Sequence, residues 1–579
     1  MNILLTAINA KYIHSNLAVY SLRACAGEYR DAVELAEYTI NNQKDYILEE
    51  LYKRKPDVLC FSCYIWNIDY VTDIAREYKK LCPSVPIWVG GPEVSYEVEA
   101  FLRENPYIDG VMIGEGEDTF RELCGYYAHK RKLSDIAGIA FRKNSTGNST
   151  SVNNIGGNKA GEIVFTSPRP IKNMSEIPFC YDTLDDFSNR IIYYESSRGC
   201  PFSCSYCLSS VDKTLRFRDT RIVKRELKFF IDQKVPQIKF VDRTFNCNHA
   251  HAMELWRFIK ANDNGVTNFH FEISADLLNQ EELELISDMR PGLIQLEIGV
   301  QSTNEVTIKE IHRTMKLERL KEVVKLIQSG NNIHEHLDLI AGLPYEDYDS
   351  FGRSFDEIYE LKPNQLQLGF LKVLKGSYMF EHAAEYGIVY HDKPPYEVMS
   401  TKWLSFDDVI KIKRVEDMLE VYYNSGQFEI TMKLMECIFD SAFEFFQELG
   451  DFYEANGYFG MSHSRIRRCE ILLEFLALYL HGCDNDDMTS VVLSENAGDR
   501  DNTDFDENAI DRDNTDFDEN AQIYNMIQES LIFDLYYREN CKSRPVWATD
   551  IGSFKHMTHA YCKNGKLSHV EPFHYIFPD

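Results

Sequence analysis

The chain of 579 residues lacks any run of about 18 apolar residues, the length that a membrane-spanning helix needs. Its first residues, MNILLTAINAKYIHSN, have no basic region ahead of the short apolar run, which is typical of a first strand and not of a signal peptide. The 15 cysteines lack the spacing of an extracellular disulfide framework. We therefore expect a cytoplasmic protein without membrane contact, in which clustered cysteines are metal ligands.

Positive charge is also scarce. Lys and Arg total 62 against 91 Asp and Glu, a formal net charge of −29, which repels phosphate backbones. The one compact basic run, Arg465 to Arg468 (RIRR), is typical of a solvated helix face. We do not expect nucleic acid as a partner. Because 44% of the residues are hydrophobic, the chain is globular, and at about 150 residues per domain it holds about three to four folded units.

Part of the acidity lies in an identical repeat, DRDNTDFDENA, at residues 499–509 and 511–521. The spaced carboxylates suggest a calcium loop, but Asp504 occupies the sixth position, which needs Gly, and Ile510 the twelfth, which needs Glu. We therefore predict a disordered acidic insert over about residues 484–521.

The first 130 residues alternate apolar strand-like runs with helix-like segments, the strands being residues 2–6, 32–37, 58–63, 87–90 and 110–113. Five such units in series predict an α/β domain with a doubly wound parallel sheet. Ligands of these sheets bind beyond the carboxyl ends of the strands. Three loops there can bring backbone close to a ligand, and they supply the candidate binding residues Ser62, Tyr64, Gly90, Gly91, Glu115 and Gly116.

The composition changes over residues 131–190, and residues 143–161 are rich in Ser, Asn, Gly and Thr. This composition predicts a linker with a hairpin. The alternation of strand and helix then returns, and it predicts a partial (β/α)6 barrel over residues 191–390. Its expected strands are residues 192–195, 237–241, 268–273, 293–300, 334–340 and 365–370. Residues 391–579 are mostly helical in pattern and predict a separate C-terminal domain.

A cluster of three cysteines follows the first barrel strand in SSRGCPFSCSYCLSS. Cys200, Cys204 and Cys207 have the spacing C-x3-C-x2-C on a loop that Gly and Pro interrupt. Three thiolates this close can hold one iron-sulfur cube and leave its fourth iron open for a small molecule. The alternative is a zinc site, which normally needs a fourth protein ligand.

With Tyr206 before the last cysteine, this loop resembles the C-x3-C-x-aromatic-C loop of the radical S-adenosylmethionine (SAM) superfamily. The resemblance implies a [4Fe-4S] cluster whose open iron binds SAM and whose electron cleaves SAM to a 5′-deoxyadenosyl radical. It also implies SAM contacts at the ends of successive strands, namely Tyr206, Asp242, Arg243, Glu272, Glu297 and Gln301. The other interpretation is that each carboxylate among them is an ordinary polar residue at a strand end. The chain departs from the superfamily after the second strand, where VDRTFN replaces the usual GGE segment.

On the fifth barrel strand, His334, His336 and Asp338 share one face by the period of two residues. They could form a second metal site. The other interpretation is that they are hydrogen-bonded residues of the barrel interior.

Together, the N-terminal sheet and the barrel resemble the radical SAM proteins that carry a cobalamin-binding domain before the barrel. The loops GGPE and GEGE resemble the edges that hold the corrin in that family. The residues around His14, YIHSNL, lack the Asp and Gly of the D-x-H-x-x-G pattern, so His14 is interpreted as a loop residue and not as a cobalt ligand. The C-terminal region resembles an uncharacterised helical domain found in some members.

These resemblances imply a cobalamin-dependent radical SAM enzyme with a [4Fe-4S] cluster, SAM and cobalamin, and methylation of an unactivated carbon is the favoured reaction. Rearrangement, cyclisation or oxidation, with or without cobalamin, stays open, as does a non-catalytic corrinoid or iron-sulfur sensor. The expected partners are a small-molecule or peptide substrate and a reductase that supplies low-potential electrons.

Overall fold

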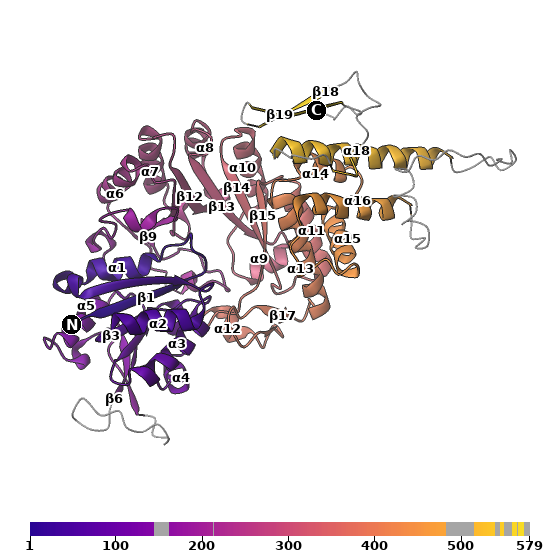
Figure 1. Ribbon diagram of the computed structural model, residues 1–579. Helices are drawn as coiled ribbons and strands as arrows, with labels where there is room; N and C mark the ends of the chain where they lie inside the picture. Colours follow the sequence, from indigo (N-terminus) through magenta and orange to yellow (C-terminus); the bar gives the residue numbers. More distant parts are fainter. Residues whose placement is uncertain are drawn as a thin grey trace. The chain divides into compact units, whose positions relative to one another are not determined.

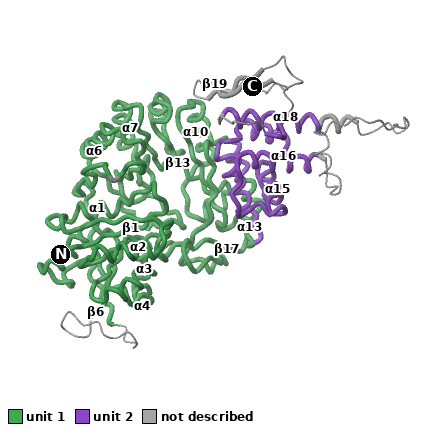
Figure 2. The backbone as a smooth tube through the Cα atoms, viewed as in Figure 1, with its two compact units in different colours: residues 1–354, 361–406 green, residues 355–360, 407–579 purple. Residues whose placement is uncertain are grey.

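A computed structural model describes residues 1–143, 161–211, 213–481, 514–538, 545–548, 558–563 and 566–572. The chain forms two compact units (Figures 1 and 2). The first comprises Met1–Ser354 and Leu361–Phe406, and the second comprises Phe355–Glu360 and Asp407–Asp579. In the described part of the chain, no helix has the length and apolar character needed to cross a membrane.

The N-terminal sheet has the strand order β2-β1-β3-β4-β5-β6-β7. The first five strands are parallel, and β6 and β7 continue the sheet in antiparallel pairing. The predicted hairpin thus extends the sheet past residue 130, while residues 144–160, on which most of the Ser- and Gly-rich segment falls, lie outside the described residues. The strands are β1 Ile3–Asn9, β2 Val33–Thr39, β3 Val58–Ser62, β4 Ile87–Gly90, β5 Gly110–Met112, β6 Ile139–Lys143 and β7 Glu162–Phe165.

Both faces of this sheet are covered by helices because its strands are apolar on both sides. Ile3, Leu5 and Ala7 of β1 belong to one buried cluster, and Leu4 and Ile8 belong to the other. The first cluster is completed by α1 (Leu17–Cys25) and α5 (Glu117–Tyr127). The second is completed by α2 (Lys44–Arg54), α3 (Ile68–Leu81) and α4 (Val98–Glu104). Because helices cover both faces, a ligand can reach this sheet only at the ends of its strands.

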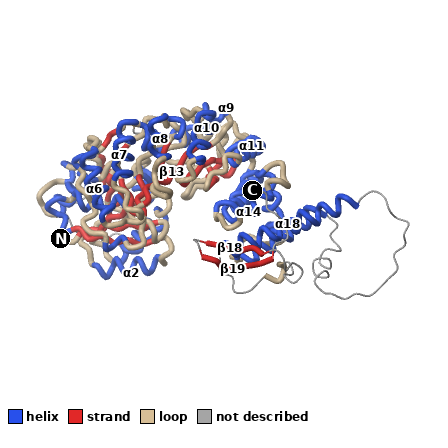
Figure 3. The backbone as a smooth tube through the Cα atoms, turned by 90° about the horizontal axis from the view of Figure 1, so that it is seen from above, coloured by secondary structure: helices blue, strands red, loops and turns tan. Residues whose placement is uncertain are grey.

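The second sheet has six parallel strands in the order β15-β14-β13-β12-β11-β8, which is an open (β/α)6 arc. Figure 3 shows helices along the outer side of these strands. The strands are β8 Ile192–Tyr194, β11 Gln237–Phe240, β12 Asn268–Ile273, β13 Ile294–Gln301, β14 His334–Ala341 and β15 Gln365–Phe370. The helices are α6 Thr220–Asp232, α7 His249–Ala261, α8 Gln280–Ser287, α9 Glu305–Glu310, α10 Leu317–Ser329 and α11 Tyr348–Tyr359.

The C-terminal part of the first unit continues after β15 with α12 (Tyr378–His382) and the strand pair β16 (Val389–Tyr390) and β17 (Val398–Ser400). The second unit is mostly helical. Its elements are α13 Phe406–Met418, a π-helical segment Leu419–Asn424, α14 Glu429–Met435, α15 Ala442–Ala455, α16 Arg465–His481, α18 Asn514–Arg538 and the hairpin β18 Thr558–Lys563 with β19 Lys566–Pro572.

Two expectations for this unit meet described residues. Helix α18 begins at Asn514, inside the predicted acidic insert. The remaining part of the predicted insert that falls on residues 484–513 lies outside the described residues. The RIRR run is not simply solvated. Arg465 donates to the Gln427 carbonyl at 2.8 Å, and Arg467 pairs with Glu474 at 2.6 Å.

Glu335 of β14 gives a prediction on stability. Its side chain is buried, and burial raises its pKa to about 8 although Gln328 opposes the shift. A raised carboxyl pKa means that stability is greatest below the unfolded pKa and falls as pH rises toward 8. We expect Glu335→Gln to stabilise the protein by about 2–4 kcal/mol at pH 8 and by little at pH 4.5.

Calorimetric unfolding midpoints at pH 4.5 and pH 8 check this prediction. Glu284 is exposed on α8, so Glu284→Gln is the matched control and should show no such pH dependence. An equal shift of the midpoint by Glu335→Gln at both pH values contradicts the account.

Candidate active site

The three cysteines lie on the loop that follows β8, at the carboxyl end of the barrel strands. Cys204 is buried, Cys200 and Cys207 are half-buried, and all three are free thiols. The short strand β9 (Ser197–Arg198) leads into the loop and pairs with β10 (Arg216–Phe217) beyond it. Between them, Gly199 has φ +90°, and a Cβ there would lie 2.6 Å from the Thr214 carbonyl oxygen, so only glycine fits this crossing.

The middle of the loop is held by backbone hydrogen bonds on both sides. The Ser205 N–H donates to the Ile311 carbonyl at 2.9 Å, and the Met379 N–H donates to the Ser205 carbonyl at 2.9 Å. Ser205 is the residue after Cys204, so segments from two other parts of the barrel fix the position of that thiol. A loop held in this way is preorganised for a ligand that its thiols bind.

Asp242 lies behind the cysteine loop and does not line the cavity described below. Its buried carboxylate accepts hydrogen bonds from the Ser196 N–H at 2.9 Å, the Ser196 hydroxyl at 2.6 Å and the Ser197 hydroxyl at 2.5 Å. Burial raises the pKa of Asp242 to about 7, although these hydrogen bonds oppose the shift. The side chain therefore anchors β9, and the structure does not bring it to the other predicted SAM contacts.

A small polar cavity of about 140 Å³ opens beside Cys204 at the carboxyl ends of the barrel strands. Cys204 and four predicted contacts lie in its wall: Arg243, Glu272, Glu297 and Gln301. Tyr206 lies next to it and accepts a hydrogen bond from Arg313 at 3.4 Å. The structure thus brings together the cysteine loop and most of the polar residues predicted around it.

The carboxyl groups of this cavity differ in their environment. Burial opposes ionisation of Glu297, but His270 and Lys239, each 2.9 Å from it, lower its pKa to about 2. Burial raises the pKa of Glu272 and of Asp338, and the Asp338 Oδ1 has no hydrogen-bond partner among the described residues. The cavity therefore combines one firmly ionised carboxylate with two carboxyl groups whose ionisation is opposed by burial, and their oxygens suit a ligand with hydroxyl and amino groups.

Arg313 is a cavity residue that the sequence analysis missed. Its buried guanidinium donates to the Gly299 carbonyl, to the Tyr206 hydroxyl and, at 3.9 Å, to the Cys204 thiol. It follows α9 in the stretch HRTM and matches no motif, so no sequence signal pointed to it. It joins the cysteine loop to the irregular end of β13, where Gln301 has φ +78°.

His334, His336 and Asp338 lie along one face of β14, and their neighbours are polar. His336 Nε2 lies 2.8 Å from Gln295 Nε2, and its ring centroid lies 4.7 Å from that of His334. Burial lowers the pKa of His336 to about 4, so this imidazole is neutral near pH 7. Among the described residues, no group of three or more His, Cys, Asp or Glu side chains is placed to hold a single metal ion. An iron-sulfur cube instead spreads its thiolates over separate irons, so its ligands need no single-ion geometry.

The predicted binding edge of the N-terminal sheet contains Ser62, Tyr64, Gly90 and Gly91. Gly91 has φ +122°, and a Cβ there would lie 2.4 Å from the Cys63 carbonyl oxygen, so the backbones of two loops meet here. Tyr64 stacks on Trp66 with ring centroids 4.4 Å apart. These four residues therefore lie on adjoining loops at the ends of β3 and β4.

His14 makes a different contact. Its Nδ1 lies 2.7 Å from the Tyr193 hydroxyl of β8. Burial lowers the pKa of His14, which favours the neutral form of the imidazole.

Glu115 and Gly116 serve the junction between the N-terminal sheet and the barrel. Glu115 pairs with Arg216 at 2.6 Å and with Arg198 at 3.4 Å, so its carboxylate is engaged by the strands that flank the cysteine loop. Gly116 is the N-cap residue of α5, and a Cβ there would lie 3.0 Å from the Leu22 side chain. The structure does not bring Glu115 to the loops of Ser62 and Gly90 as a free carboxylate.

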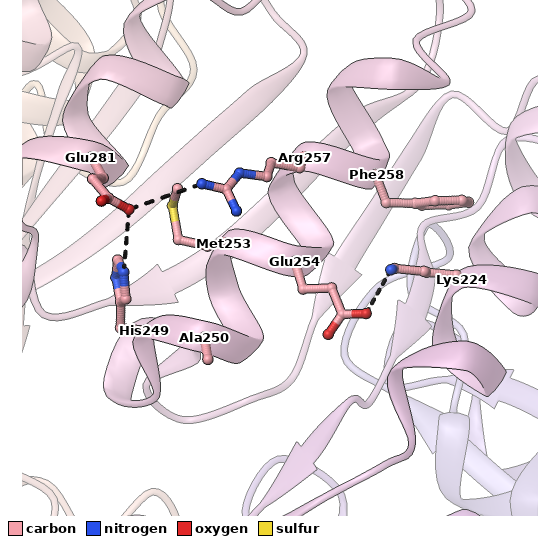
Figure 4. A pocket seen from close by; sticks show the side chains of 8 residues that line it. All are labelled: Lys224, His249, Ala250, Met253, Glu254, Arg257, Phe258 and Glu281. Atoms are coloured by element: carbon pink, nitrogen blue, oxygen red, sulfur yellow. Dashed lines mark hydrogen bonds and ion pairs between the residues drawn. The ribbon is translucent and has the colours of Figure 1, made fainter.

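A larger hollow of about 520 Å³ lies among the outer helices α6, α7 and the start of α8 (Figure 4). Its charged side chains pair with one another: Lys224 with Glu254 at 2.6 Å, and Glu281 with both His249 and Arg257. No predicted site residue lines it. The chemistry-bearing residues thus belong to the smaller cavity at the strand ends.

Three protein families match successive parts of the chain. The B12 binding domain matches residues 3–124, the Radical SAM superfamily matches residues 194–358, and the family described as Protein of unknown function (DUF4080) matches residues 384–572.

Individual proteins are similar over the same region. The cobalamin-dependent radical SAM methyltransferase TokK of Streptomyces tokunonensis is 28% identical over 362 residues, which are 58% of this chain and 49% of TokK. The uncharacterized methyltransferase PH0819 of Pyrococcus horikoshii is 24% identical over 371 residues, 62% of this chain and 75% of that protein. The chain thus spans about half the length of TokK. Among solved structures, the cobalamin-dependent S-adenosylmethionine radical enzyme OxsB is similar in fold, with a TM-score of 0.56 and 14% identity over 92% of this chain and 79% of OxsB.

The cysteine loop at the end of the first strand of the six-stranded arc lies inside the match to the Radical SAM superfamily, so residues 194–358 form a radical SAM domain. More particularly, the chain carries a B12 binding domain before the barrel and a C-terminal domain of a family of unknown function. The predicted family and fold class are confirmed.

Proposed function

We propose that this protein is a cobalamin-dependent radical SAM enzyme that methylates an unactivated carbon. The observation that carries the proposal is the loop of three free thiols, Cys200, Cys204 and Cys207, beside a cavity of converging polar side chains. When bound, a [4Fe-4S] cluster with SAM supplies a carbon-centred radical, and cobalamin supplies a methyl group. The donor set fits the cluster, because three thiols leave one iron open for SAM.

The cavity residues have distinct roles in this proposal. Glu297, kept ionised by Lys239 and His270, accepts hydrogen bonds from ribose hydroxyls or from the amino group of SAM. Glu272 and Gln301 complete that polar wall, and Arg243 balances the carboxylates. Tyr206, bonded to Arg313, would lie beside the cluster, and Asp242 holds β9 in place through Ser197. These residues would bind and orient SAM and exclude water from its site.

The corrin is expected at the edge formed by Ser62, Tyr64, Gly90 and Gly91. The close approach of Gly91 to Cys63 leaves a wall of bare backbone, to which a large planar ligand can come close. Glu115 and Gly116 would contribute by fixing α5 against the cysteine loop. His14 is engaged by Tyr193, which favours cobalt without a protein imidazole.

The substrate we propose is a small molecule or a peptide with polar groups, because the barrel interior next to the cavity carries His270, His336 and Gln295. A reductase would supply the low-potential electron. We place the enzyme in the cytoplasm, where the free thiols stay reduced.

The proposal predicts two products from SAM. Protein reconstituted with iron, sulfide and cobalamin and incubated anaerobically with dithionite, cell extract and methyl-labelled SAM should release 5′-deoxyadenosine and S-adenosylhomocysteine together. Mass spectrometry of the extract should reveal a labelled methyl acceptor. Release of 5′-deoxyadenosine alone contradicts methylation and favours rearrangement, cyclisation or oxidation. Release of neither favours a sensor.

A further inference from the structure

Residues 371–400 are here called the bracing segment. This segment contacts both the cysteine loop and the loop that follows β4. It is anchored on the barrel sheet, because the Leu371 N–H donates to the Ala341 carbonyl at 2.9 Å and the Val398 N–H donates to the Leu371 carbonyl at 2.8 Å. Its two arms are joined where the Val373 N–H donates to the Tyr396 carbonyl at 3.0 Å. The family of unknown function begins to match inside this segment, at residue 384.

On the cluster side, the bracing segment supports the cysteine loop and α9. The Met379 N–H bonds to the Ser205 carbonyl at 2.9 Å, and the Tyr386 hydroxyl donates to Glu310 at 2.8 Å. Glu310 ends the helix that leads to Arg313, which contacts Cys204. This half of the segment therefore belongs to the framework around the cluster.

On the other side, the same segment contacts the loop at the end of β4. The buried Tyr396 donates its hydroxyl proton to Glu93, and Lys375 Nζ lies 5.4 Å from the Tyr396 ring centroid. Gly376 packs so closely on Tyr96 that a Cβ would lie 2.2 Å from its ring. Glu93 and Tyr96 follow Gly90 and Gly91 in the same loop, and no motif predicted this contact.

We infer that Tyr396 is a positioning residue for cobalamin. Through Glu93 it fixes the loop of Gly90 and Gly91 relative to the barrel, so that the affinity for the corrin depends on the region of unknown function. The inference rests on the proposed cobalamin site. Loss of the hydroxyl frees the loop at one end, and corrin binding must then order it again, which weakens binding.

The test compares two variants of the full chain, each reconstituted with iron and sulfide and titrated with hydroxocobalamin by visible absorption. Tyr396→Phe keeps the ring beside Lys375 but loses the bond to Glu93, and its Kd should rise about three- to tenfold. Tyr386→Phe loses the equivalent hydroxyl on the cluster side and should bind within about twofold of the wild type. Iron content and cobalamin-free release of 5′-deoxyadenosine should not change in Tyr396→Phe.

Variants of Glu93 show whether Tyr396 and Glu93 act together on cobalamin binding. Glu93→Gln keeps an acceptor for Tyr396 and should bind cobalamin nearly as the wild type does, while Glu93→Ala should match Tyr396→Phe. The double variant Tyr396→Phe with Glu93→Ala should be no weaker than either single variant. The melting temperature and iron content of Tyr396→Phe show whether this variant folds. If it misfolds, the Glu93 variants still test the inference.

The inference would be overturned by an unchanged affinity for cobalamin in Tyr396→Phe or by an equal loss of affinity in Tyr386→Phe. Additive effects of Tyr396→Phe and Glu93→Ala in the double variant would overturn it as well. Those results leave the proposed function intact, because the wild type still binds cobalamin. Wild-type protein that binds no cobalamin overturns the proposed function and the inference together.

Discussion

Replacing Cys204 by Ala should abolish cleavage of SAM, with a fall of at least about 1,000-fold in the rate of 5′-deoxyadenosine release. Cys204 is the buried cysteine of the three and the one in the cavity wall, so its loss removes an iron ligand at the place where SAM is proposed to bind. Two remaining thiolates cannot hold a stable cube. The measurement is product release under dithionite, together with iron per chain and visible absorption.

Cys247 gives a matched control. It is half-buried after the second barrel strand, but it is not on the cysteine loop. Cys247→Ala should retain iron and most of the cleavage rate. Turnover by Cys204→Ala at the wild-type rate ends the radical SAM account of this loop.

Replacing Arg313 by Ala should lower the rate of 5′-deoxyadenosine release by about 100-fold while most of the iron is retained. One guanidinium donates to the cysteine loop through Tyr206 and Cys204 and to β13 through Gly299. Its removal leaves these acceptors unpaired and takes positive charge from a cavity that holds Glu272, Glu297 and Asp338. Single-turnover kinetics with reduced, reconstituted protein measure the effect.

Arg313→Lys separates charge from geometry. Lysine keeps the charge but not the planar fork, so this variant should recover only part of the lost rate. Arg319 lies on the outer helix α10, where it donates to Glu322 at 3.2 Å, and Arg319→Ala should have no comparable effect. Equal rates for Arg313→Ala and the wild type contradict a role for Arg313 in this cavity.

Sequence periodicity was sufficient to predict the parallel strands of the two sheets, because these strands are short apolar runs between clear turns. It also brought Glu272 and Glu297 together correctly, since parallel strands end at one edge and these residues pair directly in register. The cysteine loop could be found from the sequence alone, because its three cysteines lie within eight residues of one another. Features that depend only on neighbouring residues could therefore be predicted.

Contacts that depend on the path of the chain after a strand could not be predicted. Asp242 follows β11, but its carboxylate turns behind the loop to Ser196, which lies between β8 and β9, and to Ser197 of β9. Glu115 stands where a binding loop was expected, yet Arg216 and Arg198 engage it. Tyr396 meets Glu93 from 303 residues away in the sequence, and only packing of the whole unit brings them together.

The most direct test of the account is the metal content of the full chain, purified without oxygen from cells supplied with cobalamin and read with its visible spectrum. The account predicts about four irons and about one cobalt per chain, with absorption of both an iron-sulfur cluster and a corrinoid. Iron without cobalt, even after reconstitution with cobalamin, contradicts the cobalamin-dependent function. One zinc in place of iron contradicts the radical SAM chemistry itself.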